Sequence, residues 1–112
     1  MTLINYLKSL WKRLTRRQKV NQIEWVQSRH DIPDDIGKNL FIVGHSNSKW
    51  VVIKCPCGCG ERLDVNLMKS HYPHWNISYQ SEKISLYPSI WLSEDKCGSH
   101  FWLKKNNIIW VD

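Results

Sequence analysis

Apolar and polar side chains alternate in several short stretches from residue 39 onward, and this period of two is the strongest restriction on the fold. Successive side chains of a β-strand point to opposite faces, so such alternation is typical of strands with one buried face. The alternation is clear in residues 62–67, 75–79, 84–86 and 101–103, while residues 40–45 and 50–54 look like a pair of strands and residues 108–111 form a closing apolar stretch. About six or seven short strands joined by polar turns predict a mainly β fold, either a small antiparallel sandwich or a rolled sheet.

The length of the chain fits one such domain. With 112 residues it is too short for a two-domain enzyme, a large barrel or a doubly wound nucleotide-binding fold. Seven Trp residues supply large surfaces for a core, and the chain contains no alanine, the best helix former. No apolar run approaches the roughly 20 residues that cross a bilayer.

The net charge of +6 comes from the N-terminal segment. Six Lys and Arg residues lie within residues 1–19, and no acidic residue precedes Glu24. The other ten basic residues are balanced by ten acidic ones, so the body of the protein is neutral. Nucleic-acid-binding domains normally carry a basic face, and we therefore expect no nucleic-acid partner.

Residues 2–19 have the spacing of a basic amphipathic helix. Apolar residues recur there at intervals of three and four, with Lys and Arg mostly on the other sides. Such a helix can pack on its own domain, dock on a partner or lie on a membrane surface. Of these three locations, the membrane surface is not favoured. The charges follow the apolar residues instead of preceding them, so this is not a secretory signal. We expect a cytoplasmic protein.

Four cysteines form two clusters that indicate a metal site. The first is Cys55-Pro-Cys57-Gly-Cys59, and the second begins at Cys97 in Cys97-Gly-Ser-His100. Zinc prefers four such ligands in a tetrahedron, commonly delivered as two short clusters, although iron remains an alternative. Cysteines two residues apart are poorly placed to form a disulfide with each other. We therefore expect zinc, and three segments: a basic amphipathic helix (1–20), a connection (21–38) and a zinc-binding β domain (39–112).

His100 is a fifth candidate for four ligand positions. If Cys55, Cys57, Cys59 and Cys97 fill the site, it is closed to water and structural, and His100 is free. If His100 is a ligand, one cysteine is surplus and could be a nucleophile. The sequence leaves both arrangements open.

A free His100 could activate a serine hydroxyl. Ser89 is the best candidate, because Pro88 is expected to end its strand and leave Ser89 projecting at a rim. Ser99 is less suitable, since neighbouring side chains of a strand point to opposite faces. Glu61 or Asp95 could orient the histidine, and the sequence does not choose between them.

Several motifs in this order resemble one small bacterial family, long described as a domain of unknown function. They are CPCGCG at 55–60, Trp75 after a proline-containing loop, LYPSI at 86–90, CGSHF at 97–101 and an apolar ending with Trp110. The resemblance covers about residues 40–111. Members resemble companions of bacterial ubiquitin-like conjugation operons, which are linked to phage defence and also encode E1-like and E2-like enzymes.

The resemblance implies a peptidase that processes or removes a ubiquitin-like protein. It favours a serine-type activity over a metal-dependent one, with Ser89 and His100 at the family's "PS" and "SHF" positions and the cysteines at its metal site. The expected partners are the ubiquitin-like protein, its conjugates and the E1-like and E2-like enzymes. The alternatives are a non-catalytic zinc-binding adaptor for these proteins and a zinc-dependent hydrolase.

Overall fold

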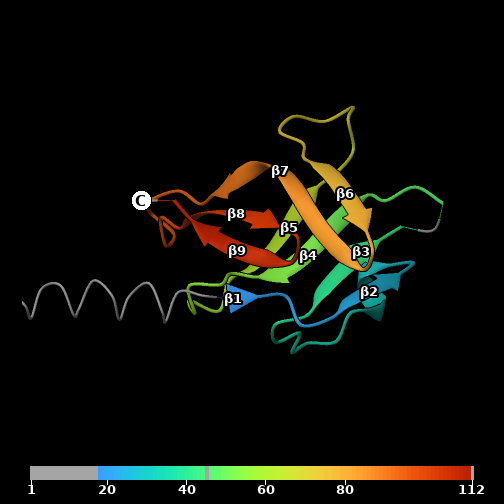
Figure 1. Cartoon of the computed structure of the whole chain (residues 1–112), viewed down its shortest axis with the longest axis horizontal. Helices are drawn as coiled ribbons and strands as arrows, with labels where there is room; N and C mark the ends of the chain where they lie inside the picture. The colour runs from blue at the N-terminus through green and yellow to red at the C-terminus, as the bar shows by residue number, and fades with distance from the viewer. Residues whose placement is uncertain (1–17, 45, 112) are drawn as a thin grey trace, which may run out of the picture.

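The computed structural model describes residues 18–44 and 46–111, which form two β-sheets (Figure 1). The described residues contain nine strands and one 3₁₀ turn. The elements are β1 (Gln18–Lys19), β2 (Ile23–Val26), η1 (Arg29–Asp31), β3 (Leu40–Val43), β4 (Trp50–Lys54), β5 (Arg62–Asn66), β6 (Asn76–Gln80), β7 (Lys83–Trp91), β8 (His100–Lys104) and β9 (Asn107–Trp110). The prediction of a mainly β fold is confirmed.

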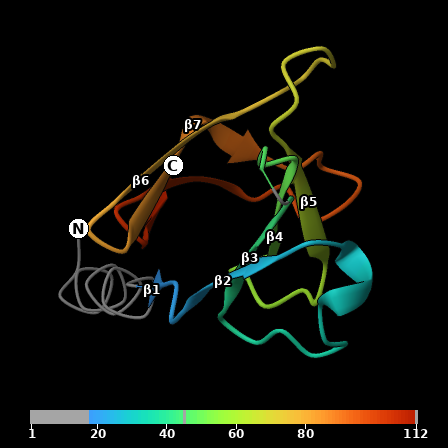
Figure 2. The same ribbon diagram turned by 90° about the vertical axis from the view of Figure 1, so that its right-hand side faces the viewer.

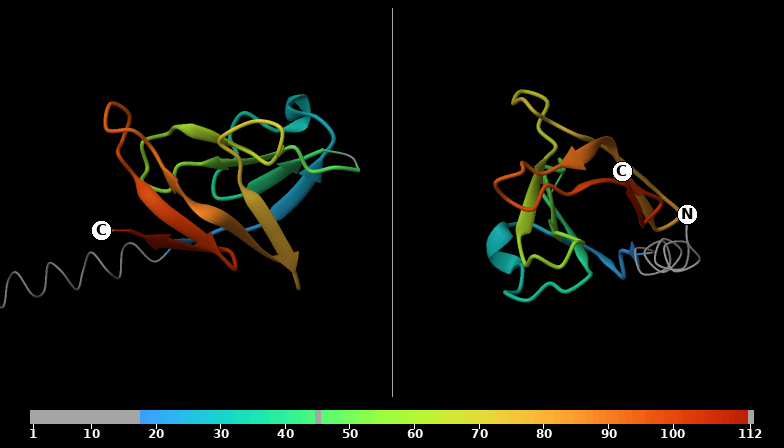
Figure 3. Two further views of the ribbon diagram at one scale, coloured as in Figure 1. Left: turned by 90° about the horizontal axis from the view of Figure 1, so that it is seen from above. Right: turned by 90° about the vertical axis from the view of Figure 1, so that its left-hand side faces the viewer.

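The two sheets form separate layers. One has five strands in the order β1-β9-β8-β7-β6, and the other has four in the order β2-β3-β4-β5. Figures 2 and 3 show β6 and β7 in one layer and β3, β4 and β5 in the other. All neighbouring strands are antiparallel except β2 and β3, which run parallel.

The main core lies between the sheets and explains the alternating pattern. Phe101 and Leu103 on β8 and Ile84 and Leu86 on β7 are buried there, as are their counterparts on β3, β4 and β5. The outward-facing residues of β8, His100 and its neighbours at every second position, are only partly buried or exposed. One face of the five-stranded sheet is thus in the core and the other is available for chemistry.

A second apolar cluster covers the far face of the four-stranded sheet. Ile32 and Ile36 from the segment after η1 pack there against Phe41 and Val52. η1 lies beside β5 (Figure 2), and Arg29 forms an ion pair with Asp64 of β5 at 3.2 Å. β3 is therefore buried on both faces, which is why its sequence is continuously apolar instead of alternating.

The predicted connection over residues 21–38 is wrong in part, because it contains β2 and η1. β2 pairs in parallel with β3, from Ile23 opposite Leu40 to Val26 opposite Val43, so the sheet is not purely antiparallel. The strand was missed because Ile23 and Val26 are partly buried whereas the two residues between them are exposed. That burial pattern has no period of two.

The helix predicted for residues 2–19 lies mostly outside the described residues. Its predicted end is wrong, because Gln18 and Lys19 form β1 and pair with β9. The Gln18 amide donates to the Pro56 carbonyl at 2.7 Å and accepts from the Trp110 indole at 3.2 Å. These contacts stabilise an extended backbone. Across 18–44 and 46–111, no helix has the length and apolar character needed to cross a membrane.

Candidate active site and metal centre

Ser89 and His100 lie on the neighbouring strands β7 and β8, with their side chains in contact. The Ser89 Oγ and His100 Nε2 atoms are 2.7 Å apart, within hydrogen-bond distance. Both residues are partly buried. The structure therefore brings together the hydroxyl and the imidazole that the sequence singled out.

An irregularity in β7 aims Ser89 at its partner. Leu86 pairs with Leu103 and Ile90 with Phe101, so β7 has three residues where β8 has one. Such a bulge bends a strand and redirects a side chain, and it accommodates a proline that cannot donate to the ladder. The expectation that the strand ends at Pro88 is wrong, because β7 continues to Trp91. Ser89 is thus held within a strand, which is a more rigid mount than a rim.

A loop between β5 and β6, which protrudes at the top of Figure 1, holds the backbone of Ser89. Its last residue, Trp75, donates from the indole Nε1 to the Ser89 carbonyl at 3.3 Å. The loop is organised by the buried Asn66. Its amide nitrogen donates to the carbonyls of Met68, His71 and Pro73 at 3.3, 3.3 and 3.0 Å, and its oxygen accepts from the Met68 N–H at 3.0 Å.

Sequence reasoning missed Asn66. It lies at the end of an alternating stretch, and nothing in the spacing marks it as the organiser of the following loop. The sequence marks Trp75 only as the start of a predicted strand and as part of a motif. Its contact with Ser89 depends on the fold of the β5–β6 loop that ends at Trp75.

The imidazole of His100 stacks on the indole of Trp91. The ring centroids are 4.6 Å apart and the planes differ by 4°, and the two residues are cross-strand partners. Neither proposed acid hydrogen-bonds His100 in the described structure. Glu61 pairs with Lys96 at 3.4 Å, and Asp95 is exposed, with its pKa lowered mainly by a hydrogen bond from Ser93.

The four cysteines meet at one end of the molecule. Their sulfur atoms all lie within 4.8 Å of one another, and the group does not include His100. Cys55 Sγ is 3.4 Å from Cys57 Sγ and 3.7 Å from Cys97 Sγ. Tetrahedral ligands at a Zn–S distance of about 2.3 Å would lie about 3.8 Å apart. The four sulfur atoms therefore lie close enough together to hold one metal ion that prefers sulfur ligands, as zinc does.

The loop from Cys55 to Gly60 is shaped to present sulfur atoms. Gly58 and Gly60 have φ values of 91° and 84°, a conformation that glycine adopts without strain. The turn points backbone N–H groups at sulfur, with Cys59 N 3.3 Å from Cys57 Sγ. Such contacts favour the thiolate form, which is the form that binds metals.

The thiols differ in their pKa values. Burial raises the pKa of Cys55 to about 12. Burial also acts to raise the pKa of Cys57, but hydrogen bonds with Ser99 and Cys59 outweigh it and lower the pKa to about 6. The hydrogen bonds around Cys57 thus favour its thiolate form, whereas the burial of Cys55 disfavours its thiolate unless a positive partner is present. A metal ion would supply that partner.

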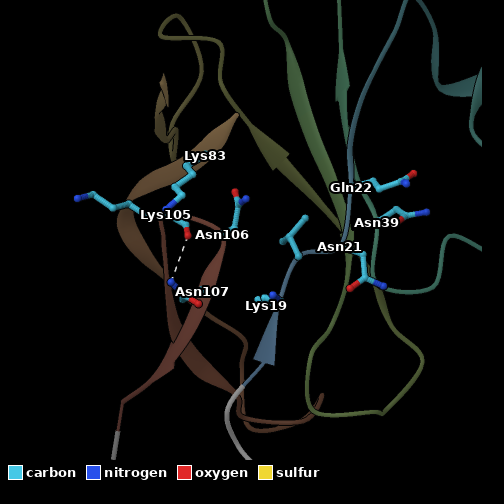
Figure 4. Close-up of a pocket in the computed structure, with 9 residues that line it drawn as sticks. Lys19, Asn21, Gln22, Asn39, Lys83, Lys105, Asn106 and Asn107 are labelled. Carbon is cyan, nitrogen blue, oxygen red and sulfur yellow. Dashed lines mark hydrogen bonds between the residues drawn. The ribbon is translucent and has the colours of Figure 1, made fainter. Parts of the chain in front are cut away.

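A cavity of about 380 Å³ lies between the cysteine cluster and His100. Cys57 and Cys97 line one part of it, and His100 and Trp110 line another. A larger cavity of about 730 Å³ lies elsewhere, lined by Lys19, Lys83, Lys105 and amide side chains (Figure 4). That larger cavity has no carboxylate, imidazole, thiol or hydroxyl in its lining, so it lacks the groups for hydrolysis.

Comparisons with known proteins agree with the motif resemblance. A family model described as bacterial ubiquitination-like system serine protease (BubE) matches residues 28–111. That range contains Ser89, His100 and all four cysteines. No curated protein matches the chain, and no solved structure does.

Proposed function

Because the chain belongs to the BubE family of serine proteases of a bacterial ubiquitination-like system, we propose that it cleaves a ubiquitin-like protein from a precursor or a conjugate. Ser89 is the nucleophile and His100 is its base. The observation that carries this proposal is the 2.7 Å contact between Ser89 Oγ and His100 Nε2. A nucleophile and a base within hydrogen-bond reach are the first requirement of such a mechanism.

The residues act in two steps. His100 Nε2 accepts the proton of Ser89 while Oγ attacks the scissile carbonyl carbon, and the resulting imidazolium then protonates the leaving amine as the C–N bond breaks. Water next attacks the acyl-serine ester and gives its proton to His100, which returns it to Ser89 Oγ. The backbone of Ser89 stays fixed throughout, held by the pairing of the next residue, Ile90, with Phe101 of β8 and by the Trp75 indole at its carbonyl.

We propose that Cys55, Cys57, Cys59 and Cys97 hold a structural zinc ion. Zinc supplies folding energy in such sites, and four protein ligands leave no position for water. The cysteine loops flank the strand that carries His100, since Cys97 lies three residues before it. The metal centre thus fixes the start of β8 and does not take part in bond cleavage. This arrangement also argues against the zinc-dependent hydrolase.

The substrate class follows from the family. We propose the ubiquitin-like protein and its conjugates as substrates, with the E1-like and E2-like enzymes of the same system as further partners. The reaction belongs in the cytoplasm, where cysteine ligands remain reduced. An extended modifier tail can add to a sheet edge by main-chain hydrogen bonds.

The test is cleavage of the ubiquitin-like protein fused through its C-terminus to a reporter. Ser89→Ala and His100→Ala are each expected to abolish cleavage with folding and metal content unchanged. The double variant is expected to lose no more than either single one, because the pair acts as a unit. Ser78→Ala, an exposed serine of β6, is the matched control and should retain full activity.

Two outcomes would overturn the proposal. Full cleavage by Ser89→Ala would rule out this nucleophile. A wild-type protein that binds the modifier tightly without cleaving any fusion or conjugate would instead be an adaptor, a function that the exposed side chains of Tyr87 and Trp91 beside Ser89 would suit.

A further inference from the structure

We propose that the indole of Trp91 positions His100 for catalysis, a task that a carboxylate performs in serine–histidine–aspartate triads. This inference rests on the proposed function and names a residue that the family match leaves unassigned. Its basis is the parallel stack of the two rings, with centroids 4.6 Å apart and planes 4° apart.

His100 is held by few hydrogen bonds. Within the described residues, its one side-chain hydrogen bond is with Ser89. The two acids nearest in sequence to the cysteine clusters are engaged elsewhere, Glu61 by Lys96 and Asp95 by Ser93. An imidazole held at a single nitrogen can still rotate about that bond. A second, planar contact is needed to fix the orientation of the ring.

The register of β7 against β8 places Trp91 directly opposite His100. The Leu92 N–H donates to the Ser99 carbonyl at 2.8 Å, and Trp91 pairs with His100 at the next position. Trp91 and His100 therefore occupy a non-hydrogen-bonded site of the antiparallel ladder, where facing side chains are closest. The bulge that aims Ser89 also sets this pairing.

The stacked indole also suits the change of charge on His100 during the reaction. The imidazole becomes a cation when it takes the serine proton, and the face of an indole attracts a cation placed over it. The stack therefore favours the charged ring that forms along the reaction path over the neutral ring of the resting enzyme. An interaction that strengthens in the transition state raises kcat, whereas uniform binding changes only KM.

Exposure makes the inference testable without damage to the fold. The Trp91 side chain is 71% exposed and lies outside both core clusters. Trp25 is a matched control, because it is also exposed, at 52%, and its ring contacts Tyr79 edge-on at 5.8 Å. It lies on β2 in the other sheet.

The experiment measures kcat and KM for cleavage of the modifier fusion by Trp91→Ala, Trp91→Phe and Trp25→Ala. We expect Trp91→Ala to lower kcat about threefold to fivefold with KM within about twofold, since a cation–π contact at an exposed site is worth a factor of about this size. Trp91→Phe should recover most of the loss, and Trp25→Ala should match the wild type. NMR of histidine-labelled protein should show the His100 ring protons shifted upfield by the indole, and Trp91→Ala should remove that shift.

An unchanged kcat with a raised KM in Trp91→Ala would overturn the inference and make Trp91 a substrate platform. An unshifted His100 spectrum in the wild type would also overturn it, because the rings would not be stacked in solution. Neither result would contradict the proposed function. That proposal fails separately, if Ser89→Ala still cleaves.

Discussion

Removal of the Asn66 side chain tests how the loop behind Ser89 is held. Asn66 is 9% exposed, and its amide nitrogen donates to three carbonyls of the loop while its oxygen accepts from the Met68 N–H. The two amide hydrogens are shared among three acceptors, so the side chain supplies three hydrogen-bonding groups. At about 1 kcal/mol each, Asn66→Ala should lower the free energy of unfolding by about 3 kcal/mol.

Asn66→Asp should cost more than Asn66→Ala, about 4 kcal/mol at neutral pH, since a carboxylate would face the same carbonyls without a hydrogen to donate. Urea unfolding followed by tryptophan fluorescence measures both values. Asn76→Ala is the control, because Asn76 is exposed at the start of β6, and its change should stay within about 0.5 kcal/mol. A loss below about 1 kcal/mol for Asn66→Ala would refute the reasoning.

Further predictions concern the metal, the loop and the N-terminal segment. Cys97→Ser should yield protein with little bound metal and a poor fold, because the metal's binding energy is largely folding energy; a folded, metal-free variant on elemental analysis would contradict this. Acidification should release the metal, since each thiolate ligand takes up a proton, and a chromogenic chelator would detect it; retention down to pH ~3 would argue against thiolate ligands. Trp75→Phe should remove the bond to the Ser89 carbonyl and lower kcat severalfold, equivalent to about 1 kcal/mol; an unchanged kcat would show that the bond does not position Ser89. Deletion of residues 1–17 should leave the β domain folded by circular dichroism, since the core described above begins at Val20; unfolding would place those residues in the core.

The strands with one buried face could be predicted from the sequence. Residues 62–67 were predicted as a strand, and β5 spans Arg62–Asn66, with Leu63 and Val65 buried and Arg62 and Asp64 exposed. Alternation marks such strands because burial on one face selects every second residue. β2 gave no such signal, since its two central residues are exposed. Its parallel pairing with β3 is set by the path of the intervening chain, which local pattern does not encode.

The chemistry of the site was easier to predict than its geometry. The cysteine spacing indicated a metal site and left open whether His100 belongs to it, and the structure places the four sulfurs together without His100. Ser89 and His100 were chosen for their chemical types and motif positions. The Trp91 stack could not be predicted, because it depends on the register beyond the bulge in β7. A shift of one residue there would turn Trp91 to the opposite face.

The identity of the nucleophile is tested most directly by labelling with a fluorophosphonate, which forms a covalent adduct with activated serines. The wild type that cleaves the modifier fusion should carry one adduct, and peptide mass spectrometry should locate it on Ser89. His100→Ala should not be labelled, because its serine lacks the base. An actively cleaving protein with no adduct on Ser89, or with the adduct on another residue, would contradict the account.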